Sequence, residues 1–183
     1  MKILVGYASA HGSTRSIAAR IASELVEQGH EAELGSMDQV GTPGSYEAFV
    51  LGSAIHNRAW LIEARDFVDA HREVLRHQPV WLFSVGMPAA LRGPWRRLAL
   101  QEEPVVAAPL RDAIGPCEHR LFSGVVRREH FSTFEHLIFK VMGCRYGDYR
   151  DWHAVDAWSR DVTRRLASGE GAASRTGGHD AHD

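Results

Sequence analysis

The chain has 183 residues, of which 44% are hydrophobic and 24% are charged, and its formal net charge is −2 at pH 7. A chain of this length most simply forms one domain with a substantial core, and its near-neutral charge gives no reason to expect a nucleic-acid partner. No apolar run approaches the roughly 18–20 residues that span a bilayer. Cys117 and Cys144 lack metal-ligand or redox spacing, so we expect a protein of the reducing cytoplasm.

Apolar runs that predict buried strands alternate with helical patterns along the chain. The first run, residues 3–7, leads into small and hydroxylated residues and then into an apolar stripe of helical spacing that starts at Ser13, a predicted N-cap, and ends at Gly29. Further strands are expected at 31–34, 49–51, 80–85 and 121–126, and further helices at 61–75, 131–143 and 152–166. Apolar strands separated by helices are typical of a parallel sheet covered on both faces.

Loops of small or flexible residues follow three of these strands, at 8–14, 52–60 and 86–93. Ligands bind at the carboxyl ends of the strands in an open parallel sheet, so the three loops predict a binding site at one edge. The first loop gathers backbone N–H groups, hydroxyls and a helix N-terminus, and this combination suits a phosphate. Its spacing matches neither the Walker loop nor the Gly-x-Gly-x-x-Gly dinucleotide turn.

Four stretches carry a resemblance to a known family: Ser9–Thr14, Gly52–His56 with the following helix that ends near His71, Leu82–Val85, and the segment that leads from Phe122–Gly124 to Gly147–Trp152. The chain resembles the flavodoxin-domain proteins and, within them, the menaquinone-dependent protoporphyrinogen oxidases of bacterial haem synthesis. The resemblance covers residues 1–168 and implies an α/β, flavodoxin-like three-layer sandwich with a five-stranded parallel sheet in the order 2-1-3-4-5. Residues 169–183 are rich in Gly, Ser and His, and we expect them to form a disordered tail.

Flavin mononucleotide (FMN) is the cofactor that the resemblance implies. Its phosphate would be surrounded by Ser9, His11, Gly12, Ser13 and Thr14. Its isoalloxazine ring would lie between two sets of residues, which are Gly52, Ser53, Ala54 and Ile55 in one loop and Ser84, Val85 and Gly86 in the other. Trp60 has two interpretations, because it would either stack on the ring or pack into the core.

The activity implied is oxidation of protoporphyrinogen IX to protoporphyrin IX, with menaquinone or another quinone as the electron acceptor. Because flavin carries the redox chemistry itself, no catalytic acid or base is assigned. Arg92, Arg96 and Arg97 would bind carboxylates of the porphyrinogen. His56 and Arg58 place positive charge beside the ring, which favours reduced flavin and suits an enzyme that takes electrons from a substrate.

Two other functions remain open. One is a flavodoxin-type soluble electron carrier without its own substrate, although such carriers usually dock through an acidic surface. The other is a flavodoxin-like domain that has lost its flavin.

The broad apolar face of the helix at 131–143 is core in the simplest interpretation, and it would also allow peripheral contact with the inner face of the cell membrane.

Overall fold

The structure is a computed structural model and describes residues 1–87, 103–130 and 145–169. Five parallel strands form the central sheet in the order β2-β1-β3-β5-β6. Their bounds are β1 Lys2–Ala8, β2 Glu31–Ser36, β3 Ala48–His56, β5 Val80–Gly86 and β6 Glu118–Ser123. A short strand, β4 (Ala59–Trp60), pairs antiparallel with the end of β3. Because β4 lies off the main path, the parallel strands run 2-1-3-4-5 in chain order, and the predicted fold is confirmed.

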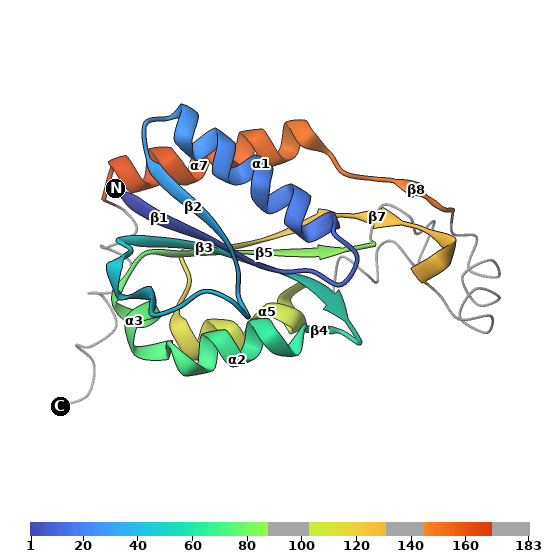
Figure 1. The fold of residues 1–183 in the computed structure, drawn as a ribbon, viewed down its shortest axis with the longest axis horizontal. Coiled ribbons are helices and arrows are strands. Elements are labelled where there is room, and N and C mark those ends of the chain that lie inside the picture. Colours follow the sequence, from blue (N-terminus) through green and yellow to red (C-terminus); the bar gives the residue numbers. More distant parts are fainter. Residues whose placement is uncertain (88–102, 131–144, 170–183) are drawn as a thin grey trace.

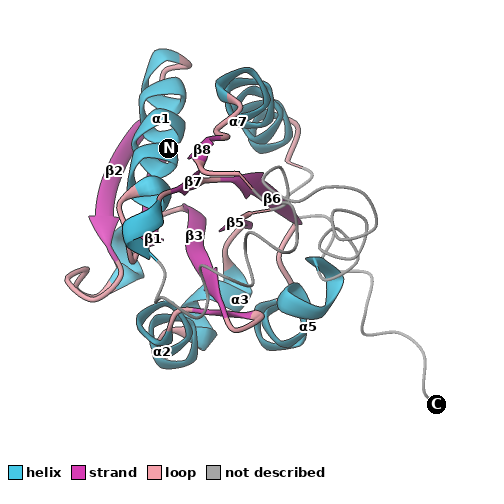
Figure 2. Cartoon of the chain, turned by 90° about the vertical axis from the view of Figure 1, so that its right-hand side faces the viewer, coloured by secondary structure: helices cyan, strands magenta, loops and turns pink. Residues whose placement is uncertain are grey.

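Helices cover both faces of the sheet and complete three layers, as Figures 1 and 2 show. One face carries α1 (Ser13–Glu27) and α7 (Trp152–Ala167), and the other carries α2 (Ile62–Ala70), α3 (Arg72–His77) and α5 (Glu103–Ile114). The connections contain two short 3-10 turns, Pro43–Ser45 and Arg128–His130. After β6 the chain forms one strand of a separate antiparallel pair, made of β7 (Val125–Val126) and β8 (Gly147–Asp148).

The core lies on both sides of the sheet because successive side chains of a strand point to opposite faces. Along β5, Trp81, Phe83 and Val85 pack towards α1 and α7, whereas Val80 and Leu82 pack towards α2, α3 and α5. The apolar runs in the sequence therefore reflect strands that are buried on both faces. By the same alternation, successive side chains at the carboxyl ends of the strands point in turn towards α1 and α7 and towards α2, α3 and α5.

Helix α7 is attached to α1 by an ionic network. Arg20 donates to both carboxylate oxygens of Asp156, from Nε at 2.7 Å and from Nη2 at 2.8 Å. Glu24, only 5% exposed, pairs with Arg20 at 3.1 Å and with Arg160 at 3.7 Å. The hydrogen bond from Arg20 holds the pKa of Asp156 below its usual range. The start of α7, and the segment just before it, are thereby kept beside α1.

Three boundaries differ from the sequence-based expectations. Ser13 is the first helical residue of α1 and not its N-cap, since Gly12 occupies that position in the left-handed conformation. The helix expected at 61–75 is broken at His71, where α2 ends and α3 begins. The strand expected at 121–126 is two strands, β6 and β7, separated by Gly124, because the chain leaves the sheet there and enters the β7–β8 pair.

Several predicted features lie outside the described residues. They are Arg92, Arg96 and Arg97, the helix at 131–143 with its proposed membrane contact, and residues 170–183 of the tail. Among the residues that are described, no helix combines the length and the apolar character needed to cross a membrane.

Candidate functional site

The loop between β1 and α1 gathers groups that suit a phosphate. Ser9 Oγ accepts a hydrogen bond from the Gly12 N–H at 3.0 Å, which tightens the loop. Gly12 has φ +86°, a conformation that favours glycine, and it is the N-cap of α1, so no side chain at that position covers the first N–H groups. Thr14 is fully buried, and its hydroxyl has no hydrogen-bond partner within the described part of the chain. Donors without partners at a helix N-terminus fit a bound phosphate.

A pocket of about 180 Å³ opens at this loop. It is lined by His11, Gly12, Ser13, Val125, Arg127 and Arg150. His11 is exposed at its rim. The other wall comes from the β7–β8 pair, which Figure 1 shows at the same end of the molecule as the start of α1. Residues far apart in the sequence therefore meet around the predicted phosphate position.

Gly124 holds that second wall against the loop. Its N–H donates to the Gly86 carbonyl at 2.9 Å, and its carbonyl accepts from the Tyr149 N–H at 3.2 Å. A Cβ atom at this position would lie 2.8 Å from Val85 Cγ1 and 3.0 Å from Ser13 Oγ. Only glycine allows the main chain to pass this close to the first turn of α1.

The end of β3 contains buried and partly exposed residues in succession. Gly52 and Ser53 are buried, and the Ser53 hydroxyl donates to the Ala54 carbonyl at 2.9 Å while accepting from the Leu61 N–H at 3.0 Å. A Cβ atom on Gly52 would lie 2.0 Å from the Phe83 ring, so packing alone requires glycine here. Ala54 and Ile55 are partly exposed. Of the four residues predicted to contact the ring in this loop, these two have side chains that a ligand can reach.

The end of β5 contains a buried polar network. Ser84 is fully buried, and its hydroxyl accepts from Trp60 Nε1 at 2.7 Å and lies 2.8 Å from His119 Nε2. Burial, together with the charge of Arg111, lowers the pKa of His119 to about 4. At neutral pH the imidazole is therefore uncharged, and it shares a hydrogen bond between Nε2 and the Ser84 hydroxyl. Trp60 is 3% exposed, which confirms its interpretation as a core residue.

The two other residues predicted at this strand end differ in exposure. Val85 is buried against Gly124, whereas Gly86 is partly exposed. The Ser84 hydroxyl is already bonded to Trp60 and His119. A ligand at the carboxyl edge would therefore meet the main chain around Gly86 and not the Ser84 side chain.

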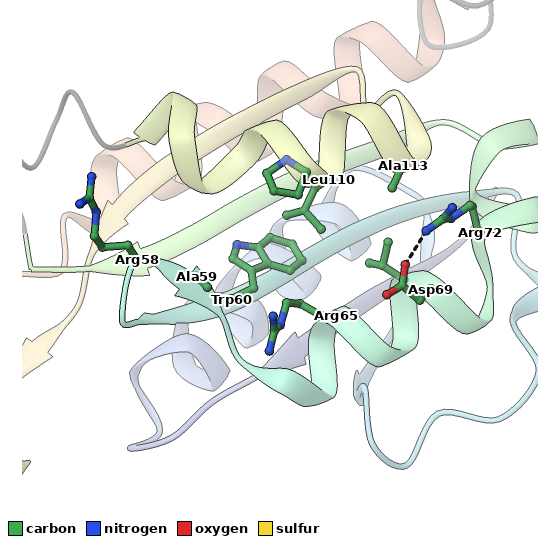
Figure 3. Close-up of a pocket in the computed structure, with 10 residues that line it drawn as sticks. Arg58, Ala59, Trp60, Arg65, Asp69, Arg72, Leu110 and Ala113 are labelled. Atoms are coloured by element: carbon green, nitrogen blue, oxygen red, sulfur yellow. Dashed lines mark hydrogen bonds and ion pairs between the residues drawn. The ribbon is translucent and has the colours of Figure 1, made fainter.

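A second pocket lies between α2 and α5 and begins at the β3–β4 turn (Figure 3). In that turn Asn57 and Arg58 have φ values of 49° and 61°, which places Arg58 at the tip of the hairpin. The pocket has a volume of about 330 Å³. It combines charged and apolar groups, and the residues that line it include Arg58, Arg65, Asp69, Arg72, Trp60 and Leu110. Arg72 is paired with Asp69 at 2.7 Å.

Sequence reasoning missed the contribution of the β7–β8 segment to the first pocket. It gave no site role to Gly124, Arg127 or Arg150. The available signals were the glycine directly after a strand and the Gly-Asp-Tyr-Arg sequence before the last helix. Neither signal indicates by itself that the segment reaches the start of α1.

Comparison with known proteins agrees with this geometry. The profile of the flavodoxin domain family matches residues 4–151. The chain is 24% identical over 173 residues to an Escherichia coli K12 protein named protoporphyrinogen IX dehydrogenase [quinone], and the aligned region covers 88% of this chain and 94% of that one.

Solved structures of flavodoxins and flavodiiron-type enzymes share the fold. Oxidised flavodoxin 1 from Bacillus cereus matches with a TM-score of 0.58 at 15% identity, over 91% of this chain and 99% of that one. Rubredoxin oxygen:oxidoreductase from Desulfovibrio gigas matches with a TM-score of 0.61 at 14% identity, over 91% of this chain. The matched region is only 36% of that longer chain. The protein described here belongs to the flavodoxin domain family and is an FMN-binding oxidoreductase.

Proposed function

We propose that the protein oxidises protoporphyrinogen IX to protoporphyrin IX and passes the electrons through FMN to menaquinone or another quinone. The observation that carries this proposal is the similarity to the Escherichia coli protein named protoporphyrinogen IX dehydrogenase [quinone], which extends over 88% of this chain and 94% of that protein. A flavodoxin domain alone would not select this activity, because one fold serves many functions.

The reaction requires a site that binds flavin beside a large, acidic substrate. In each cycle a pair of electrons and a pair of protons leave the porphyrinogen, and one quinone is reduced to a quinol. FMN supplies the redox chemistry when it is bound. The residues proposed to hold its phosphate are Ser9, His11, Gly12, Ser13 and Thr14, and the strand ends at 52–55 and 84–86 are proposed to flank its ring.

Cationic groups near the carboxyl edge support an enzyme that accepts electrons from an anionic substrate. His56 and Arg58 are both exposed at the end of β3. Positive charge near a flavin favours its reduced form, and guanidinium groups pair with carboxylates in a fixed geometry. The pocket that starts at Arg58 also offers an apolar floor at Leu110 and a second cation at Arg65 (Figure 3). One edge of a tetrapyrrole, with its carboxylates, has the chemistry to fit there.

The test is anaerobic oxidation of protoporphyrinogen IX, followed by porphyrin fluorescence, with FMN and a menaquinone analogue present. Reactions without protein are needed because porphyrinogens oxidise spontaneously. Arg58→Ala should lower kcat/KM by about fivefold, which corresponds to about 1 kcal/mol of lost ion pairing. Arg164→Ala is the matched control, because Arg164 is 75% exposed on α7 and pairs only with the nearby Asp161 among described residues.

A rate that needs protein, FMN and quinone together supports the proposal. A protein that binds FMN but gives no such rate refutes it and favours the electron carrier. A protein that fails to bind FMN at all would instead contradict the cofactor assignment and leave the domain without redox chemistry.

A further inference from the structure

We propose that Arg150 and Arg127 bind the phosphate group of FMN from the side opposite the loop at 8–14. This inference rests on the FMN site that underlies the proposed function, but it involves neither porphyrinogen nor quinone. Both arginines line the pocket of about 180 Å³ together with His11, Gly12 and Ser13. A phosphate in this pocket would lie between the N–H groups of the first turn of α1 and two guanidinium groups.

Arg150 is held in a fixed position at the start of α1. Its Nε donates to Asp148 Oδ1 at 2.8 Å and its Nη2 donates to Asp148 Oδ2. The guanidinium also lies over the Trp152 ring, 4.7 Å from its centroid. Its Nη1 donates to Ser16 Oγ at 2.8 Å, and that hydroxyl donates to the Ser13 carbonyl at 2.7 Å. The side chain is thus linked to the same helical turn whose N–H groups face the pocket.

The pair formed by Arg150 and Asp148 is oriented with its positive end inward. The side chain of Arg150 is 22% exposed, whereas that of Asp148 is 48% exposed. The hydrogen bond from Arg150 lowers the pKa of Asp148. The carboxylate therefore stays charged and binds the guanidinium group of Arg150 from the solvent side. The inner edge of the guanidinium then adds its charge to the start of α1.

A cation at this end of a helix is unfavourable unless an anion is bound there. The N-terminus of a helix carries a partial positive charge, and Asp or Glu is the residue type that stabilises it. Helix α1 has no acidic residue in its first turn, and Arg150 lies against its Ser16. A phosphate between the helix and the arginine would turn this repulsion into two attractive interactions.

Arg127 would complete the wall at the rim of the pocket. Its side chain is 64% exposed and lies 3.3 Å from Glu129, itself 70% exposed. An exposed ion pair contributes little and is a weak competitor for a bound anion. We therefore assign the larger share of phosphate binding to Arg150 and a smaller share to Arg127.

The experiment compares FMN with riboflavin, which lacks the phosphate. Flavin is removed from the full chain, and each ligand is titrated while its fluorescence is followed. Arg150→Gln should weaken FMN binding at least about tenfold and leave riboflavin binding within about twofold. Arg150→Lys keeps the charge and should fall between the wild type and Arg150→Gln. Arg164→Gln, a similar arginine paired with Asp161 on α7, should change neither affinity.

Arg127→Gln provides an independent variant, because so exposed a side chain has little part in folding. It should weaken FMN binding about twofold to fivefold and reduce the loss of affinity between low and high salt. Two results overturn the proposal. One is that Arg150→Gln and Arg127→Gln both bind FMN as the wild type does. The other is that FMN and riboflavin affinities fall together, which indicates a structural role. Neither result bears on porphyrinogen oxidation, which is measured separately.

Discussion

Replacing Gly52 with Ala should destabilise the protein even when no flavin is present. The new methyl carbon would lie 2.0–2.3 Å from three atoms of the Phe83 ring, far inside van der Waals contact. Phe83 is fully buried and its ring packs against Phe122 and Trp158, with centroids 6.2 and 6.1 Å away. Since the ring has no space to turn into, β3 and β5 must shift. Overpacking of this kind costs about 1–3 kcal/mol.

Urea unfolding of the flavin-free protein, followed by circular dichroism, measures this cost. A loss of about 1–3 kcal/mol corresponds to a fall in Tm of about 2–4 °C per kcal/mol for a chain of this size. Gly44→Ala is the matched control, because a Cβ atom there meets nothing within 4 Å. It should stay within about 0.5 kcal/mol of the wild type.

The double variant Gly52→Ala with Phe83→Leu tests the cause. Leucine removes part of the ring, so adding the methyl group to the Phe83→Leu background should cost less than about 0.5 kcal/mol, and the two changes should be strongly non-additive. The reasoning is refuted if Gly52→Ala leaves the flavin-free protein as stable as the wild type. If FMN affinity then falls, Gly52 is required by the flavin and not by Phe83.

Three further changes test the local structure by equilibrium unfolding of the flavin-free chain. Asp151→Ala removes the side chain that accepts from the Ala154 N–H at the start of α7, and it should cost about 1 kcal/mol; an unchanged midpoint would show that the cap contributes nothing. Ser84→Ala leaves the buried Trp60 Nε1 without its acceptor and should cost about 1–3 kcal/mol, whereas a cost below about 0.5 kcal/mol would contradict the network. Because the pKa of His119 falls from 6.5 to about 4 on folding, its contribution is complete above pH 6.5 and is lost as the pH falls towards 4. The wild type should therefore lose on the order of 2–3 kcal/mol more than His119→Gln over that interval, and equal losses would refute the assignment.

The sheet could be predicted from the sequence because its central strands, β1, β3 and β5, are buried on both faces. Runs such as 49–51 and 80–83 are apolar without interruption, and runs of this kind are typical of strands in a parallel sheet between two helical layers. The two-residue strands β4 and β8 were not predicted, since elements this short show no periodicity. The apolar stripe continues through His71 and by itself predicts one helix over 61–75, whereas the family resemblance indicates a helix that ends near His71, as α2 does.

The site was predictable to the extent that it is local. The loop at 8–14 and the carboxyl ends of β3 and β5 were identified from neighbouring residues in the sequence. The packing of Gly52 against Phe83, and the hydrogen bond between Ser84 and Trp60, depend on contacts between strands and helices that no local pattern reveals. The approach of Arg150 to Ser16 joins residues 134 positions apart, so the second wall of the pocket required the folded structure.

The attachment of α7 to α1 also bears on how the chain is made. Arg20 and Asp156 are 136 residues apart, and Ile17 and Ile21 on α1 share one core cluster with Val155 and Val162 on α7. During synthesis from the N-terminus, the apolar face of α1 leaves the ribosome long before the helix that covers it. The nascent chain must therefore hold that face against the sheet, or have it shielded by a chaperone, until almost the whole protein has been made.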